Sequence, residues 1–500
     1  MRPLPTVPAA PSAGSLAPPL LHGLRWKAVS QGVELCTRAV VSVTLARLLG
    51  PRELGLAGMA LAFSALGQAF ADAAVSSAIV QRRDLSELDR STAFWMTLCA
   101  GAALSALGVA TSRLVAGFFG EPRVGALFAV MSCGFLVGAA GAVPAALLAR
   151  ALDFRRLELC GIAGRSLGAV VAVGAAVGGT GAWAIPAQML ATMVVTGVLL
   201  WLATSWRPRA VFSRVSMREL GSFGLDVLGS RLFFYLQRNV DNLIVGRALG
   251  ASRLGAYALA YNLMMLPFAQ LVDPLRTVLF PVLSSIQGDR ARVAALWLRS
   301  TRALVALVLP IQLGLLVAAP DFVAVVLGGR WRAAVGPIQV LAVVGCLQSL
   351  IVVNSIVLTA LGHTRALLRF SLLTFLLSVA GFALGLRWGL VGVAAGYLVA
   401  TALIVPIYMR LTLRTLGMPL RVFLGAMAGV TISAAVASAC MFVTRLALLA
   451  ADTPAGARLV GVAALGVVAA VTLESRRVPE LRAELSFIRR ALARLANPEA

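Results

Sequence analysis

Ten charged side chains lie within long apolar runs of this 500-residue sequence, and five are basic and five acidic. They are Glu34, Arg38, Asp72, Arg165, Asp226, Arg231, Arg238, Asp241, Asp273 and Arg276. An arginine in a low-dielectric cleft suits phosphate, because its planar guanidinium donates two hydrogen bonds and stays charged. The carboxylates must either pair with these cations or face water. The residue types therefore indicate a polar passage that can hold an anionic group.

Helical spacing brings most of these groups together. All except Arg165 fall in four apolar runs, at residues 28–49, 54–79, 221–247 and 254–281. At about 100° per residue, three amides share helix faces with the charges, namely Gln68, Gln237 and Asn242. Each charge would cost about 2.5–3.5 kcal/mol at the centre of a helix in lipid. We therefore expect these faces to line a water-filled cavity.

Structural roles are the alternative for several of these side chains. The intrahelical ion pairs that the spacing allows are Glu34–Arg38 and Asp273–Arg276. Arg165 can reach a carboxylate on a neighbouring helix. Arg47 and Arg247 lie at the ends of their spans, where a guanidinium can extend to lipid head groups instead of contacting a substrate.

The composition describes the setting of these residues. The chain is 60% hydrophobic and 13% charged, with a mean hydropathy of +0.90, whereas soluble domains are about 45–50% apolar and 25% charged. Because an apolar run of about 20 residues crosses a bilayer as a helix, the sequence predicts an all-α polytopic membrane protein with about fourteen spans. The predicted spans are 28–49, 54–79, 92–112, 124–148, 159–178, 181–203, 221–247, 254–281, 296–319, 336–361, 366–386, 388–409, 422–445 and 456–474.

A sequence repeat predicts how the spans are arranged. The pattern R-x-L-G-x-x-x-L-G starts at Arg47 and again at Arg247, and Arg38 and Arg238 obey the same offset of 200 residues. Six spans separate the copies, so both point the same way across the membrane. The repeat predicts two six-helix lobes related by a pseudo-two-fold axis along the membrane normal, with two appended C-terminal helices. Two such lobes leave a cleft between them.

The distribution of basic residues predicts the orientation. Most of the 44 lysines and arginines fall in the two tails and the even-numbered connections, which places both termini in the cytoplasm. The predicted segments are a disordered N-terminal tail (1–27), an N-lobe (28–203), a cytoplasmic linker (204–220), a C-lobe (221–409), appended spans (422–474) and an amphipathic tail (475–500). For that last tail, an ordinary solvated helix is an equal alternative.

Other classes of function are disfavoured by residue type and spacing. The net charge of +24 is spread between apolar runs instead of forming one patch, so we expect no nucleic-acid partner. Six scattered cysteines and two histidines offer neither a disulfide framework nor a metal site. The connections are too short for a catalytic domain, so we expect no enzyme activity and no cofactor.

Several motifs resemble bacterial polysaccharide exporters. The first is Ala46–Gly55 followed by Ile79–Arg82, and the second is Asn239–Arg247 running into Leu254–Tyr257. The linker Ala151–Leu157 and the stretch Val278–Ser284 fit the same pattern. The chain is similar, up to about residue 415, to the multidrug/oligosaccharidyl-lipid/polysaccharide flippase superfamily. Within it, the pattern looks most like colanic-acid-type and teichuronic-acid-type lipopolysaccharide biosynthesis exporters.

This resemblance implies a function. Relatives of this type move a glycan linked to undecaprenyl diphosphate from the inner to the outer leaflet of the bacterial inner membrane by alternating access, and several use an ion gradient. By resemblance, Arg38, Arg231 and Arg238 are candidate substrate contacts. The polar helix faces add Arg276, Gln68, Gln237 and Asn242 to this set. The candidate ion-coupling residues are Glu34, Asp72, Asp226, Asp241 and Asp273. Membrane lipids and polysaccharide polymerase or chain-length proteins are the expected partners.

Two other readings compete with glycan export. A cation-coupled drug or metabolite exporter of the same superfamily would favour acidic cavity groups without a basic cluster, whereas acids and bases are balanced here. A membrane glycosyltransferase, ligase or polymerase would need a large outward loop or an acidic motif near a span end. Glu53, Glu121, Asp321 and Asp452 are isolated in the sequence, which disfavours that class.

Overall fold

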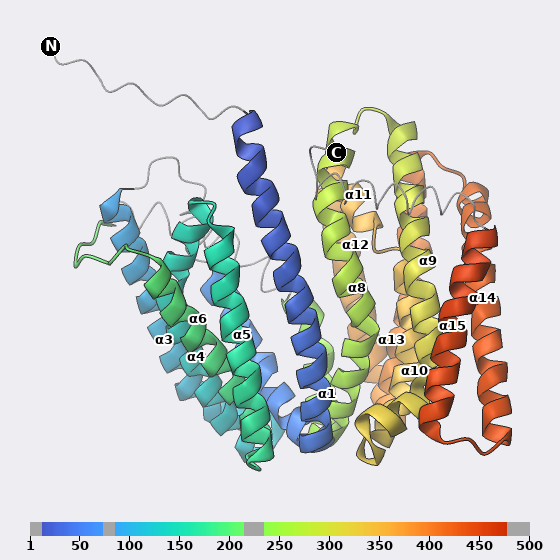
Figure 1. The fold of residues 1–500 in the computed structure, drawn as a ribbon, viewed down its shortest axis with the longest axis horizontal. Helices are drawn as coiled ribbons and strands as arrows, with labels where there is room; N and C mark the ends of the chain where they lie inside the picture. The colour runs from blue at the N-terminus through green and yellow to red at the C-terminus, as the bar shows by residue number, and fades with distance from the viewer. Residues whose placement is uncertain (1–12, 74–85, 215–234, 478–500) are drawn as a thin grey trace.

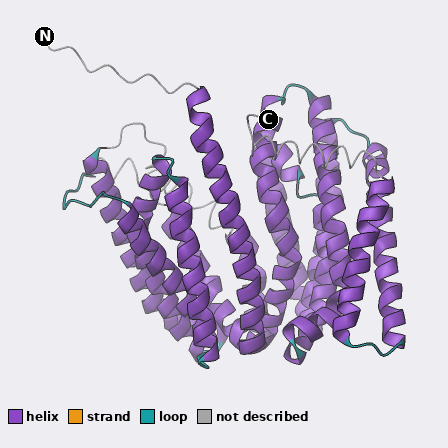
Figure 2. Ribbon diagram, viewed as in Figure 1, coloured by secondary structure: helices purple, strands orange, loops and turns teal. Residues whose placement is uncertain are grey.

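The computed structural model describes residues 13–73, 86–214 and 235–477. Within these ranges every regular element is a helix (Figure 2). The N-terminal half contains α1 (Ala13–Ala73), α3 (Glu87–Phe119), α4 (Pro122–Arg150), α5 (Phe154–Val177), the short turn η1 (Gly181–Trp183) and α6 (Ala184–Ala203). We call the described residues up to 214 the N-half, and those from 235 the C-half.

The C-half is longer and more interrupted. It begins with a helix over residues 235–249. There follow α8 (Ala251–Ser285), α9 (Arg290–Phe322), the π-helical turn η2 (Val323–Leu327), η3 (Gly329–Ala334), α10 (Val335–Ser349), α11 (Asn354–Ala360), α12 (Thr364–Gly385), η4 (Leu386–Trp388), α13 (Gly389–Leu416), α14 (Leu420–Ala450) and α15 (Ala455–Arg477). In Figure 1, α3–α6 lie on one side of α1, and α8–α15 lie on the other.

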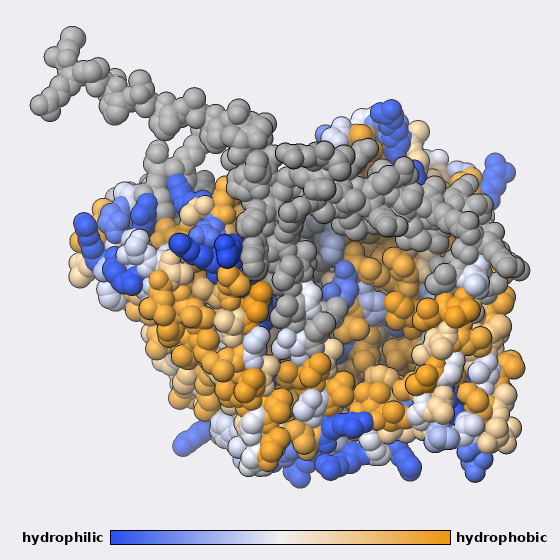
Figure 3. Space-filling view, in the orientation of Figure 1, coloured by the Kyte–Doolittle hydropathy of each residue, from blue (hydrophilic) through white to orange (hydrophobic). Residues whose placement is uncertain are grey.

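The helices agree with the predicted membrane protein. Nine helices of the described ranges are long and apolar enough to cross a membrane. Large apolar side chains such as Leu114, Leu202 and Val399 are more than half exposed, and the space-filling view shows an apolar band with polar residues at both ends (Figure 3). Each predicted span overlaps a helix in its described part. The fold class is therefore confirmed.

The boundaries differ from prediction in two places. Residues 13–27, predicted as disordered tail, belong to α1; the sequence there repeats leucine at Leu16, Leu20 and Leu24, a helical spacing. The predicted span 336–361 is divided between α10 and α11. The linker lacks regular structure over 204–213, and the C-terminal tail from residue 478 lies outside the described residues. The lobe boundaries stay predictions.

The repeated glycines Gly50 and Gly250 have the same backbone conformation. Gly50 interrupts α1 with φ 77° and ψ 176°, and Gly250 precedes α8 with φ 81° and ψ 175°. This region is open essentially to glycine alone, because a Cβ atom would clash with the backbone. Each glycine therefore makes a sharp turn between two helices at the repeat-related position.

A second glycine pair brings the two halves into direct contact. A Cβ atom on Gly55 would lie 1.7 Å from the carbonyl oxygen of Ala251, and one on Gly255 would lie 2.0 Å from that of Pro51. Pro51 and Ala251 are themselves 200 residues apart, so the contact is symmetric with respect to the repeat. We call this contact, together with the contacts of residues 46–50 with 323–334, the seam.

The main apolar core runs through the seam. Met59 and Leu127 of the N-half, and Leu254, Met264 and Ile338 of the C-half, are fully buried in one continuous cluster. Burying such side chains contributes about 1.5–3 kcal/mol each. The two halves are thus packed together at this end and not joined by a hinge alone.

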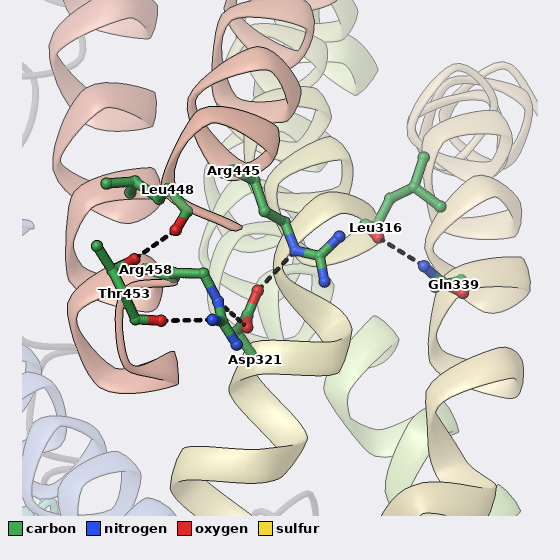
Figure 4. Close-up of polar contacts among 7 residues, drawn as sticks. All are labelled: Leu316, Asp321, Gln339, Arg445, Leu448, Thr453 and Arg458. Carbon is green, nitrogen blue, oxygen red and sulfur yellow. Dashed lines mark hydrogen bonds and ion pairs between the residues drawn. The ribbon is translucent and has the colours of Figure 1, made fainter. Parts of the chain in front are cut away.

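The appended helices are held by a buried charge cluster. Asp321, near the end of α9, is 3% exposed. Its Oδ2 accepts a hydrogen bond from Nε of Arg445 at 2.6 Å, and its Oδ1 accepts one from Nε of Arg458 at 2.9 Å (Figure 4). Arg458 Nη1 also donates to the carbonyl oxygen of Thr453 at 2.5 Å. One carboxylate therefore fixes α14 and α15 to α9.

The glycine contact predicts that two alanine substitutions on α1 differ in their effect on stability. Gly55→Ala should destabilise the protein by about 1–3 kcal/mol, because its methyl group overlaps a backbone atom. In Gly58→Ala the methyl group meets only the Leu254 side chain, at 3.8 Å, so stability should be unchanged or higher. Thermal unfolding of both purified variants in detergent measures the difference, and equal melting temperatures would contradict the close crossing.

The charge cluster predicts a large loss of stability in Asp321→Asn. Two partly buried guanidinium groups would lose the charge of their buried carboxylate, which costs up to about 3–5 kcal/mol. The control is Asp289→Asn: Asp289 caps α9 by accepting from the Arg292 backbone N–H at 3.1 Å, and its side chain is half exposed, so about 1 kcal/mol is expected. Thermal unfolding compares the two variants. If Asp321→Asn is no less stable than the control, the charge cluster does not hold the appended helices in place.

Candidate functional site

The structure describes the side chains of half of the predicted site residues. The side chains of Arg38, Gln68, Asp72 and Asp273, and the whole of Asp226 and Arg231, lie outside the described part of the structure. The described side chains are Glu34, Gln237, Arg238, Asp241, Asn242 and Arg276. Their surroundings differ, and they fall into three groups.

Glu34 is paired between helices. Its Oε2 lies 3.9 Å from Nε of Arg165, and each side chain is about one-third exposed. The pair joins α1 to α5, two helices that pack together. Arg165 therefore reaches a carboxylate of a neighbouring helix, which is the structural role considered for it.

Arg238 and Arg276 are exposed, on the 235–249 helix and on α8 respectively. Gln237 and Asn242 are half-buried on the same helix as Arg238. The Arg238 guanidinium lies near Tyr261 of α8, and Arg276 lies near Tyr408 of α13. In the space-filling view, the surface is hollowed between the two halves, and polar residues line part of the hollow (Figure 3).

Asp241 is enclosed within the C-half. It is 4% exposed, and one carboxylate oxygen accepts a hydrogen bond from the backbone N–H of Asn242 at 2.8 Å. Within the described ranges, its carboxylate has no ion-pair partner. A buried carboxylate without a counter-charge is costly, so such a group is retained where a proton or a cation neutralises it.

Three of the chain's five tyrosines extend from Asp241 across the C-half. The Tyr257 hydroxyl lies near the Asp241 carboxylate, and the Tyr257 ring stacks on Tyr261 with centroids 6.3 Å apart. Tyr261 in turn neighbours Tyr397 of α13, at 6.5 Å between centroids. Gln348 Nε2 of α10 donates to the Tyr397 hydroxyl at 2.8 Å. We call these five residues the tyrosine row.

Most of this row was not predicted from the sequence. Asp241 was predicted as an intramembrane charge, whereas the three tyrosines and Gln348 carry no charge and were not among the candidates. A usable signal was present, since Tyr257 and Tyr261 are one helical turn apart in a chain with only five tyrosines. The remaining partners, Gln348 and Tyr397, are distant in sequence and give no local pattern.

Arg47 has a role in the seam. Its Nε donates to the carbonyl oxygen of Val326 at 2.6 Å, and its Nη2 donates to that of Val325. Beside it, the Trp331 indole N–H donates to the Ala46 carbonyl oxygen at 2.9 Å. Arg47 thus satisfies unpaired carbonyl groups at the end of a C-half helix, an arrangement that also complements the helix dipole.

Comparisons with known proteins identify the family of this chain. The profile of a family described as polysaccharide biosynthesis protein matches residues 44–336. The chain is 27% identical over 353 residues to the teichuronic acid biosynthesis protein TuaB of Bacillus subtilis, covering 70% of this chain and 73% of that protein. It is 25% identical to the lipopolysaccharide biosynthesis protein WzxC of Escherichia coli, covering 77% and 79%.

A solved structure shares the fold. The lipid II flippase MurJ, in an inward closed conformation, superposes with a TM-score of 0.71 at 15% identity and covers 91% of this chain and 99% of its own. The family match covers more than half of the sequence. The chain belongs to the polysaccharide biosynthesis protein family.

Proposed function

We propose that this protein is a flippase that moves a lipid-linked oligosaccharide across the bacterial inner membrane during surface polysaccharide biosynthesis. The observation that carries the proposal is family membership, together with a fold shared with a lipid flippase. The apolar helices place the protein in the membrane. The lipid that carries the oligosaccharide is undecaprenyl diphosphate. Transport proceeds by alternating access, with the two halves separating at one end and then at the other.

The relatives support glycan export over drug efflux. TuaB and WzxC are named for teichuronic acid and lipopolysaccharide biosynthesis, and a third relative, 29% identical over 62% of this chain, is named as a succinoglycan biosynthesis transport protein of Rhizobium meliloti. Their names concern transport or assembly of glycans. We therefore assign a non-enzymatic transport role, with a polysaccharide polymerase and a chain-length protein as proposed partners.

The charge distribution supports an orientation. Both termini are placed in the cytoplasm, because basic residues are concentrated in the tails and even-numbered connections. The seam then lies toward the outer leaflet, since Gly50 follows the first span. In this orientation the seam lies on the outer side, and the hollow between the halves (Figure 3) lies on the cytoplasmic side of the seam.

We assign binding of the diphosphate to the exposed guanidinium groups of the halves. Arg238 and Arg276 are exposed and come from neighbouring helices, and a diphosphate accepts bidentate hydrogen bonds from such groups. By the repeat, Arg38 occupies the position in the N-half that Arg238 occupies in the C-half, and Arg231, Gln68, Gln237 and Asn242 complete the proposed set. Buried Asp241 is the leading candidate for ion coupling, beside Glu34, Asp72, Asp226 and Asp273.

Arg238 tests the substrate assignment. Arg238→Ala should reduce export of surface glycan at least about tenfold, because charge-assisted hydrogen bonds to phosphate would be lost. Arg238→Lys should keep part of the activity, since it retains the charge without the planar fork. The measurement is surface glycan in cells with matched protein levels, and Arg38 is tested in the same way. Normal export by both alanine variants would exclude the assignment.

Asp241 tests the coupling assignment separately. Asp241→Asn keeps the shape and the hydrogen bond from Asn242 but removes the ionisable group, so the folded protein should persist while export falls strongly. A control is Asp153→Asn, which changes an exposed helix cap and should leave export unchanged. Surface glycan and melting temperature are measured together. Full export by Asp241→Asn would remove this residue from the coupling mechanism.

A further inference from the structure

A pocket of about 370 Å³ lies on the seam, apart from the tyrosine row and the exposed arginines of the proposed substrate site. It is lined by Arg47 of the N-half and by Leu327, Gly328, Gly329, Arg330 and Trp331 of the C-half. Ligand pockets in proteins commonly have volumes of about 300–1,000 Å³. The pocket therefore has the size of a site for a small group, and it is built from both halves.

The pocket carries two positive charges and no lining carboxylate. Arg330 extends over the turn at Gly50, where its Cδ and Nη1 would lie 3.7 Å from a Cβ on that glycine. Arg47 uses Nε and Nη2 on carbonyl oxygens of η2, which leaves Nη1 without a protein acceptor in the described structure. Neither arginine has an ion-pair partner within the described residues.

The carboxylates nearest in sequence to the pocket residues, Glu53 and Asp321, are already engaged elsewhere. Glu53 accepts two hydrogen bonds from Arg123, both at 2.8 Å, and a third from the Ala182 backbone N–H at 2.7 Å. Asp321 holds Arg445 and Arg458. The protein thus pairs these acids with other cations and leaves the guanidinium groups of the pocket for an external anion.

We propose that this pocket binds a phosphate-bearing anion, and that the bound anion holds the two halves together at the seam. Guanidinium groups bind phosphate oxygens through charge-assisted, often bidentate hydrogen bonds. Because one arginine comes from each half, the site is complete only while the seam is closed. A ligand that binds one arrangement better than another shifts the population toward it. The inference does not depend on which cargo the protein carries.

The direct test is binding of inorganic diphosphate to the purified protein in detergent at low salt, followed by thermal unfolding and by hydrogen exchange of the seam. Diphosphate should raise the melting temperature and slow exchange in residues 46–55 and 323–334. Arg330→Gln should weaken binding about tenfold or more, because it removes one of the two charges. This arginine makes no hydrogen bond in the described structure, so folding should be preserved.

The matched control is Arg332→Gln, which removes an equal charge from the same turn. Arg332 is exposed and does not line the pocket. It would therefore donate no direct hydrogen bond to the anion, and its loss should weaken binding several-fold less than Arg330→Gln does. Equal loss of binding in both variants would mean that overall charge, and not the pocket, attracts the anion, and would overturn the proposal. Binding without slower exchange at the seam would overturn the coupling.

The source of the phosphate is distinguished by a second arm. The protein is placed in nanodiscs of phosphatidylcholine alone or with phosphatidylglycerol, and seam exchange is compared with and without inorganic diphosphate. Slower exchange with phosphatidylglycerol, lost in Arg330→Gln, identifies a lipid head group as an occupant. Slower exchange only with diphosphate identifies a soluble anion. No protection in either arm refutes the site.

Discussion

The close crossing of α1 and α8 at Gly55 and Gly255 is the constraint on which the rest of the structure depends. Each glycine lies against a carbonyl oxygen of the other half, and small residues are what allow helices in a membrane to approach so closely. Larger side chains at these two positions would separate the helices and expose the core that passes between them.

That contact separates two kinds of polar group. At the seam end, arginines bind carbonyl groups and carboxylates, as Arg47, Arg123 and Arg445 do, and these interactions fix the helix ends. Away from it, Arg238 and Arg276 are exposed, and Asp241 is buried without a cation neighbour among the described residues. Charges that pair with each other stabilise one conformation, whereas the exposed guanidinium groups of Arg238 and Arg276 are available to the anionic ligand of the proposed function.

Local patterns predicted the helices and the repeat, because the length of a span and the position of a glycine turn depend on residues that are close together in the sequence. The apolar runs overlap the helices, and the shared offset of Gly50 and Gly250 appears as equal backbone angles. Partners far apart in the chain could not be predicted in this way. Asp321 was judged isolated in the sequence, yet it binds arginines 124 and 137 residues away. Tyr397 and Gln348 join the tyrosine row through the same kind of distant contact.

The location of Arg47 shows why a charge at a span end is ambiguous from sequence. A guanidinium at this depth can extend to head groups, contact cargo or satisfy the last carbonyl groups of another helix, and all three need the same residue at the same position. In this structure Arg47 binds carbonyl groups of another helix, because η2 brings unpaired carbonyl groups of the C-half to it. Breaking the seam would return those carbonyl groups and the guanidinium to water or head groups, so their exchange of partners is nearly balanced in free energy. Alternating access, as proposed for this protein, requires such an exchange of partners each time the closed end opens.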